Sequence, residues 1–503
     1  MTRLNAVKAQ PDQSLVGGRW VGGEGSQTRL IRNPADTDEV VAEVREASDA
    51  QIDEACARAA EAFVGWRATP PPERVSVLFR YRQLLEARFD EIAALIVKEN
   101  GKLLSEARGS VRRGIDVVEF SCGIPTHMMG RTLPEISKDV DCYSVREPLG
   151  VVAGIPPFNF PAMIPMWMMP IAVACGNSFI LKPSEKAPLT AAVLASLFCE
   201  AGLPLGVVSV VHGGREVSER LLASEQVQAV SFVGSSAVAE SVHRIAASAA
   251  KRVQALGGAK NHLIVMPDAD LPRGLPALTG SMYGCAGQRC LAGGVLVPVG
   301  DRRRQDEVVA SFIEASRAMR LGDGMDPAAE LCPVHSREHL ERLLGWIERG
   351  LAEGARLVLD GRSVRVPGRP RGCFLGATVF DQVDPGMAIA REEIFGPVAV
   401  ILRARDLDEA IANANRSRYG NSASIFTQSG AVVKEFRMRI QCGMLGVNLG
   451  VPAPMAFFSF GGWKQSIFAD LNAHGPDAVE FYTRKKVVTE RWFGAEAPKE
   501  GWV

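Results

Sequence analysis

One of the ten cysteines in this 503-residue chain, Cys290, has neighbours that suit covalent chemistry. It follows Gly287, Gln288 and Arg289, where the glycine permits close approach and the guanidinium would favour the reactive thiolate. Free cysteines serve more often as small apolar core residues, and this is the alternative for Cys290 and the expectation for Cys285. The segment therefore predicts a nucleophilic thiol at Cys290, to be weighed against a core cysteine.

Two further segments carry side chains that could assist at a reacting carbonyl group. Asn159 stands between Phe158 and Phe160 in an apolar, proline-rich stretch, so its amide needs hydrogen-bond partners there. It could donate to an oxyanion, or it could brace a turn. The run from Glu392 to Pro397 is typical of an acidic turn, and its carboxylates could also bind ribose hydroxyls.

The dinucleotide-binding signals are weaker, since no Gly-x-Gly-x-x-Gly motif follows any expected strand. Residues 232–236 join a strand to a helix, where Ser235 and free helix amides could bind a phosphate or simply form a helix cap. Lys182 and Glu185 follow another expected strand, either as a surface ion pair or as partners of ribose hydroxyls. In the second case the Glu185 charge would repel a 2′-phosphate and favour NAD over NADP.

The elements that position these residues follow from hydrophobic periodicity. Residues 49–128 predict packed helices, residues 131–148 predict an exposed hairpin or subunit-pairing arm, and residues 479–489 repeat that polar strand pattern. Buried strands are expected at 150–155, 178–181, 207–211, 229–233 and 262–266, with helices at 189–201 and 237–250. This order predicts a parallel sheet that binds ligands beyond the carboxyl ends of its strands. A second α/β series is expected from 268 to 450, with strands near Val295, Ala377, Val398 and Ser424 and helices near Ala315, Leu343, Ala410 and Val433.

Composition narrows the class of protein. Fifty-seven Lys and Arg balance fifty-seven Asp and Glu, whereas a nucleic-acid-binding protein would normally show a basic excess. The cysteines form no Cys-x-x-Cys pair or Cys/His cluster, which argues against metal sites and a disulfide framework. Prolines break the uncharged run 148–181 into pieces too short to span a bilayer, and residues 1–12 resemble no targeting segment. The expectation is a cytoplasmic protein that binds neither nucleic acid nor membrane.

Five motifs, taken in order, make the chain similar to the aldehyde dehydrogenase superfamily: Phe158-Asn159-Phe160, Lys182-Pro183-Ser184-Glu185, Phe232-Val233-Gly234-Ser235, Gly287-Gln288-Arg289-Cys290 and Glu392-Glu393-Ile394-Phe395-Gly396-Pro397. Residues 158–165, 260–262 and 446–454 more narrowly resemble the CoA-acylating methylmalonate-semialdehyde dehydrogenase branch, and the likeness covers about residues 15–490. The resemblance implies an α/β fold with a Rossmann-type NAD-binding domain (1–130 and 150–258), an α/β catalytic domain (259–455) and a small β oligomerisation arm (131–149 and 476–495). It also implies a homodimer or homotetramer.

The resemblance implies a role for each site residue. Cys290 would be the nucleophile, and Asn159 would form an oxyanion hole with the Cys290 amide. Arg113 and Arg289 would recognise the carboxylate of a semialdehyde, although Arg113 taken alone would pass for a helical residue paired with Asp116. The cofactor-binding residues would be Pro156 and Phe158 along the cleft, Lys182 and Glu185 on the adenosine ribose, Lys186, Ser235 near the pyrophosphate, and Glu393 on the nicotinamide ribose.

The step that releases the acyl group departs from the hydrolytic pattern. Hydrolytic relatives carry Glu-Leu-Gly-Gly-Lys, in which the glutamate activates water, whereas this chain has Ala255-Leu256-Gly257-Gly258-Ala259-Lys260. Either alignment leaves Ala255 or Leu256 at that position, and neither can act as a general base. The thiol of coenzyme A is partly ionised and more nucleophilic than water, so it needs less help. The acylating branch usually has asparagine here, so Leu256 departs from that branch as well.

The expected reaction is therefore NAD-dependent, CoA-acylating oxidation of malonate or methylmalonate semialdehyde. Loss of CO2 would accompany it and give acetyl-CoA or propionyl-CoA. The alternatives are a dehydrogenase that releases a free carboxylic acid from another semialdehyde, and an NAD-binding homologue with impaired catalysis. Valine, β-alanine and inositol breakdown all deliver semialdehydes of this kind, so the sequence leaves the pathway open.

Overall fold

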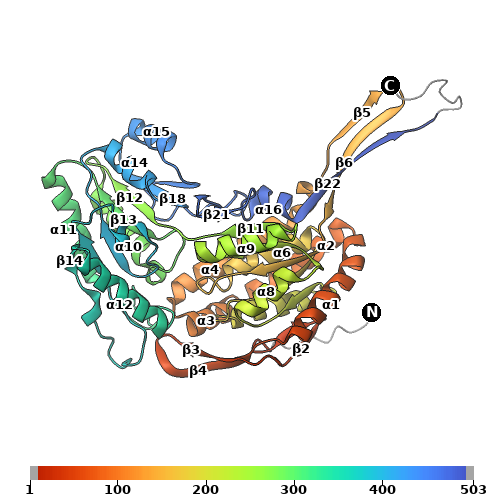
Figure 1. Ribbon diagram of the computed structural model, residues 1–503, viewed down its shortest axis with the longest axis horizontal. Coiled ribbons are helices and arrows are strands. Elements are labelled where there is room, and N and C mark those ends of the chain that lie inside the picture. Colours follow the sequence, from red (N-terminus) through yellow and green to blue (C-terminus); the bar gives the residue numbers. More distant parts are fainter. Residues whose placement is uncertain (1–9, 494–503) are drawn as a thin grey trace.

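The computed structural model describes residues 10–493, which form two large β-sheets with helices packed on them and an arm of long strands that projects from the body (Figure 1). The expected α/β fold is confirmed. Residues 1–9 of the expected NAD-binding domain and residues 494–495 of the expected arm lie outside the described residues.

The first large sheet has eight strands in the order β2-β1-β9-β8-β7-β10-β11-β21. They are β1 (Ser14–Val16), β2 (Arg19–Val21), β7 (Val151–Ile155), β8 (Ser178–Leu181), β9 (Val208–Val210), β10 (Val227–Val233), β11 (Arg252–Leu256) and β21 (Ile467–Phe468). Strands β9, β8, β7, β10 and β11 run parallel, and antiparallel strands flank them on both sides. Helices α6 (Met163–Ala174), α7 (Leu189–Glu200), α8 (Arg215–Ala223) and α9 (Ser236–Ser248) connect the parallel strands. The predicted βαβ order is therefore confirmed, although α6, α8 and β11 were not predicted.

The second large sheet has seven strands in the order β14-β15-β16-β13-β12-β18-β19. They are β12 (Asn261–Val265), β13 (Gly293–Pro298), β14 (Arg356–Leu359), β15 (Thr378–Asp381), β16 (Val398–Ile401), β18 (Ser422–Phe426) and β19 (Met444–Val447). Only β14 is antiparallel. The helices of this part are α10 (Leu271–Tyr283), α11 (Arg302–Ala318), α12 (Arg337–Ala352), α13 (Ala388–Arg391), α14 (Leu407–Asn415) and α15 (Gly430–Arg439). The expected strand at 262–266 is thus β12, which belongs to this sheet and not to the first.

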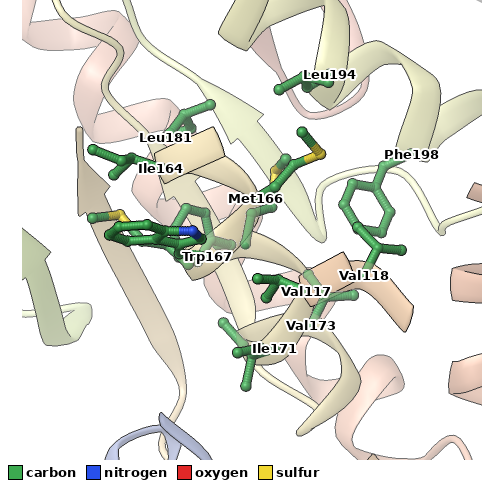
Figure 2. Close-up of a cluster of buried hydrophobic side chains, with 14 of the residues drawn as sticks. Val117, Val118, Ile164, Met166, Trp167, Ile171, Val173, Leu181, Leu194 and Phe198 are labelled. Atoms are coloured by element: carbon green, nitrogen blue, oxygen red, sulfur yellow. The ribbon is translucent and has the colours of Figure 1, made fainter. Parts of the chain in front are cut away.

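The predicted N-terminal helices pack on the first sheet: the first of them, with strands and α8, buries its apolar face in one cluster, and the helices after it share another cluster with the buried helix α6. They are α1 (Asp49–Ala68), α2 (Pro71–Ala87), α3 (Phe89–Asn100), α4 (Leu104–Cys122) and α5 (Ile124–His127), and the hairpin β3 (Thr28–Asn33) and β4 (Asp36–Arg45) precedes them. Helix α6 contributes Met166, Trp167 and Val173 to the apolar cluster shown in Figure 2. The prolines of this stretch do not prevent a helix. Pro165 lies in its first turn, where no N–H bond is needed, whereas Pro170 lies inside the helix and removes one backbone hydrogen bond. None of the helices in the described part of the chain combines the length and hydropathy needed to cross a bilayer.

The arm is a three-stranded sheet in the order β22-β6-β5. Its strands are β5 (Thr132–Ser137), β6 (Val140–Pro148) and β22 (Thr483–Arg491), and β22 is antiparallel to β6 along its whole length (Figure 1). The predicted hairpin is confirmed, but the strand predicted at 479–489 begins only at Thr483. Residues 479–482 belong to helix α16 (Gly475–Tyr482), because Val479, Phe481 and Tyr482 are buried in the core of the first sheet. A short strand pair, β17 (Tyr419–Gly420) with β20 (Trp463–Lys464), completes the fold.

Candidate active site

Cys290 lies on the loop between α10 and β13, so it precedes its strand. The loop begins with residues in the left-handed region, where Cys285 has a φ of 52° and Gly287 a φ of 68°. A Cβ on Gly287 would lie 2.2 Å from the carbonyl oxygen of Gly396, so glycine allows the loop to pack against the segment that follows Glu393. The predicted motifs at 287–290 and 392–397 are therefore in contact.

A pocket opens beside this loop, lined by α4, residues 160–167, residues 285–291 and residues 451–474. Cys290 is half-buried and lines it together with Arg113 and Arg289. The structure thus brings three of the predicted site residues to one pocket, from segments about 180 positions apart. Cys285, which we expected to be an ordinary core residue, is buried but lines the same pocket.

Asn159 follows β7 and is buried beside the Cys290 loop. Its side-chain Nδ2 donates to the backbone carbonyl oxygen of Gln288 at 2.8 Å. The backbone carbonyl oxygen of Asn159 accepts from Lys102 Nζ at 2.7 Å. One amide hydrogen is thereby used, which fixes the side chain and leaves the other hydrogen for a further acceptor. The requirement that this buried amide be hydrogen-bonded is met.

The surroundings of Cys290 disfavour its thiolate when no ligand is bound. Burial raises the pKa of the Cys290 thiol to about 12, and the negative charge of Glu393 contributes to the rise. The backbone amides of Cys290 and Leu291 and the side chain of Asn421 act in the opposite direction and lower this pKa in part.

Arg289 does not activate the thiol as the sequence suggested. Its Nη2 donates to Glu106 Oε1 at 2.8 Å, and the same carboxylate oxygen accepts the backbone amide of Cys285 at 2.6 Å. The expectation that Arg289 favours the Cys290 thiolate is therefore wrong, because Glu106 neutralises the guanidinium. In this structure Arg289 ties the nucleophile loop to helix α4.

Arg113 projects from α4 toward the loop on the opposite wall of the pocket. Its Nη2 donates to the carbonyl oxygens of Ala453 at 2.9 Å and Pro454 at 3.3 Å. Asp116 lies 4.0 Å from Nη1, so the predicted ion-pairing reach is present but long. The guanidinium therefore holds the wall of the pocket and still lines its interior.

Glu393 lies beside Lys260 in a second, smaller pocket behind the nucleophile loop. Glu393 Oε1 accepts the backbone amide of Ala259 at 2.9 Å. Burial raises the pKa of Glu393 to about 7, and burial lowers the pKa of Lys260 to about 7. A Cβ on Gly258 would lie 2.4 Å from Glu393 Oε2, so glycine is needed for this close approach.

Lys182 and Glu185 lie at the carboxyl end of β8. Lys182 is buried, and its Nζ donates to the carbonyl oxygen of Gly213 at 2.8 Å and lies 3.4 Å from Glu185 Oε2. Burial is the largest influence on the pKa of Lys182 and lowers it, whereas the Lys182 charge helps to lower the pKa of Glu185 against the effect of burial. The pair is thus an anchored structure and not a mobile surface ion pair.

The remaining predicted residues continue the same edge of the first sheet. Pro156 is buried directly after β7, and the Lys186 Nζ lies 5.5 Å from the centre of the Phe158 ring. Ser235 precedes the 13-residue helix α9, is exposed, and makes no side-chain cap bond to it. The first amides of α9 and the Ser235 hydroxyl are therefore open to a ligand.

Comparisons with known proteins agree with this geometry. The aldehyde dehydrogenase family model matches residues 20–488. The chain belongs to the aldehyde dehydrogenase family. It is 52% identical to malonate-semialdehyde dehydrogenase 3 of Geobacillus kaustophilus (strain HTA426), over 98% of this chain and 100% of that relative.

Solved structures of similar aldehyde dehydrogenases share the fold. The methylmalonate-semialdehyde dehydrogenase of Oceanimonas doudoroffii is 44% identical with a TM-score of 0.94, over 96% of this chain and 98% of that one. A protein of Sinorhizobium meliloti 1021, described as a methylmalonate-semialdehyde dehydrogenase and complexed with NAD, is 43% identical with a TM-score of 0.94, over the same shares of the two chains.

In this aldehyde dehydrogenase the two residues that could stand at the position of the missing base lie on opposite faces of β11. Leu256 ends β11, is 3% exposed, and belongs to the apolar cluster against which Cys290 packs. Ala255 faces the opposite side of the sheet and belongs to another cluster. Either residue leaves an alkyl side chain at that position, and Leu256 is the one that shares a cluster with Cys290.

Besides Glu106, three residues of the aldehyde dehydrogenase site were not predicted from the sequence. Asn261 and Asn421 both donate to the carbonyl oxygen of Cys290, at 2.8 and 2.7 Å. His474 lines the pocket with its ring 5.1 Å from that of Trp167, and burial lowers its pKa to about 4. Asn261 was noticed only as part of a motif, and nothing in the local sequence marks Asn421 or His474. Within residues 10–493 no cluster of His, Cys, Asp and Glu could hold a metal ion.

Proposed function

We propose that the protein catalyses NAD-dependent, CoA-acylating oxidation of malonate or methylmalonate semialdehyde, with loss of CO2, to give acetyl-CoA or propionyl-CoA. The observation that carries the proposal is the pocket in which a half-buried thiol meets two arginines. The apolar Leu256, which stands where hydrolytic relatives carry a general base, supports it. The names of the relatives described above support the same substrate class.

The residues at the carboxyl edge of the first sheet fit NAD. The open amino end of α9 with Ser235 would take the pyrophosphate, and Glu185 beside anchored Lys182 would take the adenosine ribose. Pro156, Phe158 and Lys186 would line the cleft, and Glu393 would take the nicotinamide ribose. NAD, when bound, supplies the hydride acceptor for the oxidation.

The residues of the chain carry the covalent chemistry. Cys290 Sγ loses its proton to solvent and attacks the aldehyde carbon, which forms a C–S bond and turns the carbonyl oxygen into an oxyanion. The free amide hydrogen of Asn159 and the backbone amide of Cys290 donate to that oxygen. Arg113 and Arg289 hold the substrate carboxylate, and Arg289 must exchange Glu106 for it.

The acyl group remains on Cys290 as a thioester after oxidation. Cleavage of its bond to the β-carboxylate releases CO2 and leaves an enolate, whose oxygen Asn159 stabilises before solvent protonates the carbon. The CoA thiolate then attacks the thioester and releases the Cys290 thiolate. Because Leu256 cannot deprotonate water, we expect the thiol to outcompete water at this step.

One observation favours a second candidate, the release of a free acid. Glu393 is a carboxylate near Cys290 with a pKa raised by burial to about 7, so it could activate water in place of the missing base. The two candidates predict different products from the same substrate.

The deciding experiment follows NADH formation from malonate and methylmalonate semialdehyde with and without coenzyme A, with mass analysis of the products. We expect turnover that depends on CoA and gives acetyl-CoA or propionyl-CoA. Steady NADH formation without CoA, with a free acid as the product, would overturn the acylating proposal and favour Glu393 as a base.

The arm supports an oligomeric assembly, for which we propose a homodimer or homotetramer. Leu133 and Val487 on the arm are 63% and 67% exposed, and β19 is an edge strand of the second sheet. We also propose a cytoplasmic location, because all ten cysteines are free, as in a reducing compartment. Light scattering of the purified protein would test the assembly.

A further inference from the structure

The backbone carbonyl of Cys290 is held by two buried side-chain amides. Asn421 Nδ2 donates to this oxygen at 2.7 Å, and Asn261 Nδ2 donates to it at 2.8 Å. The two asparagines are 5% and 2% exposed. Both lone pairs of one carbonyl oxygen therefore accept hydrogen bonds from side chains. Burying two side-chain amides costs desolvation free energy, and here the bonds fix the backbone at the nucleophile.

The sheet register explains how the two amides converge. Asn261 opens β12 and Asn421 directly precedes β18, and these strands are parallel neighbours. The backbone amide of Ser422 donates to Asn261 Oδ1 at 3.1 Å, which links the two segments. The amides are thus placed by the centre of a sheet and not by a mobile loop.

The two amides differ in how their hydrogens are used. Asn261 uses both, since its Nδ2 also donates to the carbonyl oxygen of Ala292 at 2.8 Å. Asn421 uses one on the Cys290 carbonyl, and no second acceptor is recorded for it among the described residues. Its side chain also lowers the pKa of the Cys290 thiol. Asn261 therefore has no amide hydrogen left for another acceptor, whereas Asn421 keeps one.

Few other groups around the pocket can stabilise a thiolate. Glu393 opposes it by its charge, and Glu106 already neutralises Arg289. Arg113 is bound to the loop carbonyls and lies near Asp116. His474 is neutral at pH 7, because burial lowers its pKa to about 4. Hydrogen-bond donors must therefore provide the stabilisation of the Cys290 thiolate that cations do not provide here.

We propose that Asn421 is a positioning residue that makes Cys290 more reactive than burial alone would leave it, by holding its carbonyl with one amide hydrogen and offering the other to the sulfur. Asn261 also holds the Cys290 carbonyl but has no hydrogen to offer the sulfur. The inference rests on the proposed role of Cys290 as the nucleophile. It adds a hydrogen-bond donor that favours the thiolate in an apolar pocket.

The test compares N421L with N261L, a matched loss of a buried amide at the same carbonyl. The rate of Cys290 alkylation by iodoacetamide is measured from pH 6.5 to 10 by mass analysis of the Cys290 peptide. For N421L we expect a rate about tenfold lower at each pH, which corresponds to a thiol pKa about one unit higher. For N261L we expect a pH profile that overlays that of the wild type.

A profile for N421L that overlays the wild type would overturn the proposal, and so would an equal loss in both variants. Circular dichroism and NAD binding verify that each variant is folded, and N421S replaces N421L if the latter does not fold. The assay needs neither aldehyde nor CoA. A wild-type Cys290 that is inert at every pH would refute the nucleophile itself, whereas a reactive wild type with an unchanged N421L refutes only the role of Asn421.

Discussion

The two large sheets place their functional residues at opposite ends of their strands. In the eight-stranded sheet Lys182 and Ser235 follow β8 and β10, as expected for parallel sheets that bind ligands at their carboxyl ends. In the seven-stranded sheet Cys290 precedes β13 and Asn261 opens β12. The site forms where the carboxyl edge of one sheet meets the amino edge of the other, as the bond between Ala259 and Glu393 illustrates.

This difference suggests a division of labour that can be tested. The carboxyl edge of the first sheet offers open amides and anchored charges, which suit binding of a cofactor. The amino edge of the second sheet offers a strained loop held by buried amides, which suits a fixed nucleophile. Substitution of Cys290 at one edge, or of Glu185 at the other, should therefore leave the function of the opposite edge intact.

The largest expected effect is at Cys290. C290A should reduce NADH formation by at least about a thousandfold, because the sulfur that forms the covalent adduct is lost, while the Kd for NAD changes by less than about twofold. The control is C285A, which alters a cysteine of the same pocket and should keep most of the activity. Equal losses in the two variants would show that the loop, and not the thiol, had been damaged. Stopped-flow absorbance and calorimetry measure the two quantities.

A smaller effect is expected at the edge of the first sheet. E185Q should raise the KM for NAD by about tenfold with little change in kcat, and should increase the use of NADP relative to NAD, because the charge that repels a 2′-phosphate is lost. E200Q removes another glutamate of this part, which pairs with Arg88 at 2.8 Å, and serves as the control. A fall in kcat alone would contradict the division between the edges.

The pH dependence of Cys290 alkylation tests how the amino edge of the second sheet controls its nucleophile. Since the pKa of Cys290 is raised to about 12, alkylation of the unliganded protein should accelerate about tenfold per pH unit between pH 7 and 9, without a plateau. E393Q should speed alkylation several-fold above pH 7 and have little effect below it, because the Glu393 carboxyl has a pKa of about 7 and is uncharged at lower pH. A plateau near pH 7 would indicate an activating cation that the structure lacks.

The smallest effect is expected where the arm meets helix α16, at the ion pair between Arg146 of β6 and Glu480 of α16. Hydrogen bonding from Arg146 holds the pKa of Glu480 at about 2, so this group stabilises the fold above its unfolded pKa and loses that contribution as the pH falls toward 2. E480Q should lower the free energy of unfolding by less than about 1 kcal/mol at pH 7, and the difference should shrink between pH 5 and 3. Urea unfolding at several pH values measures it, and a difference that grows in acid would contradict the sign.

The sequence predicted the strands and helices of both sheets wherever periodicity was strong, and the motifs around Asn159, Cys290 and Glu393 do converge in the structure. It could not predict the Glu106 partner of Arg289, because the two residues are 183 positions apart and no local pattern connects them. It also assigned residues 479–482 to a strand, because short apolar and polar alternation does not reveal that Phe481 and Tyr482 enter a core. In both cases contacts with residues distant in the sequence determine the local structure.

The pairing of β22 with β6 also constrains the order in which the protein can fold during synthesis. Glu147 and Lys486 bond across these strands although they are 339 positions apart. At about 5 to 20 residues per second, a ribosome needs roughly 17 to 70 s to make the second strand after the first. Throughout that interval β6 has only β5 beside it, and its other edge is open to nascent chains of the same sequence. On a crowded polysome, β6 can therefore meet the β6 edge of a neighbouring nascent chain before its own partner strand β22 has been synthesised.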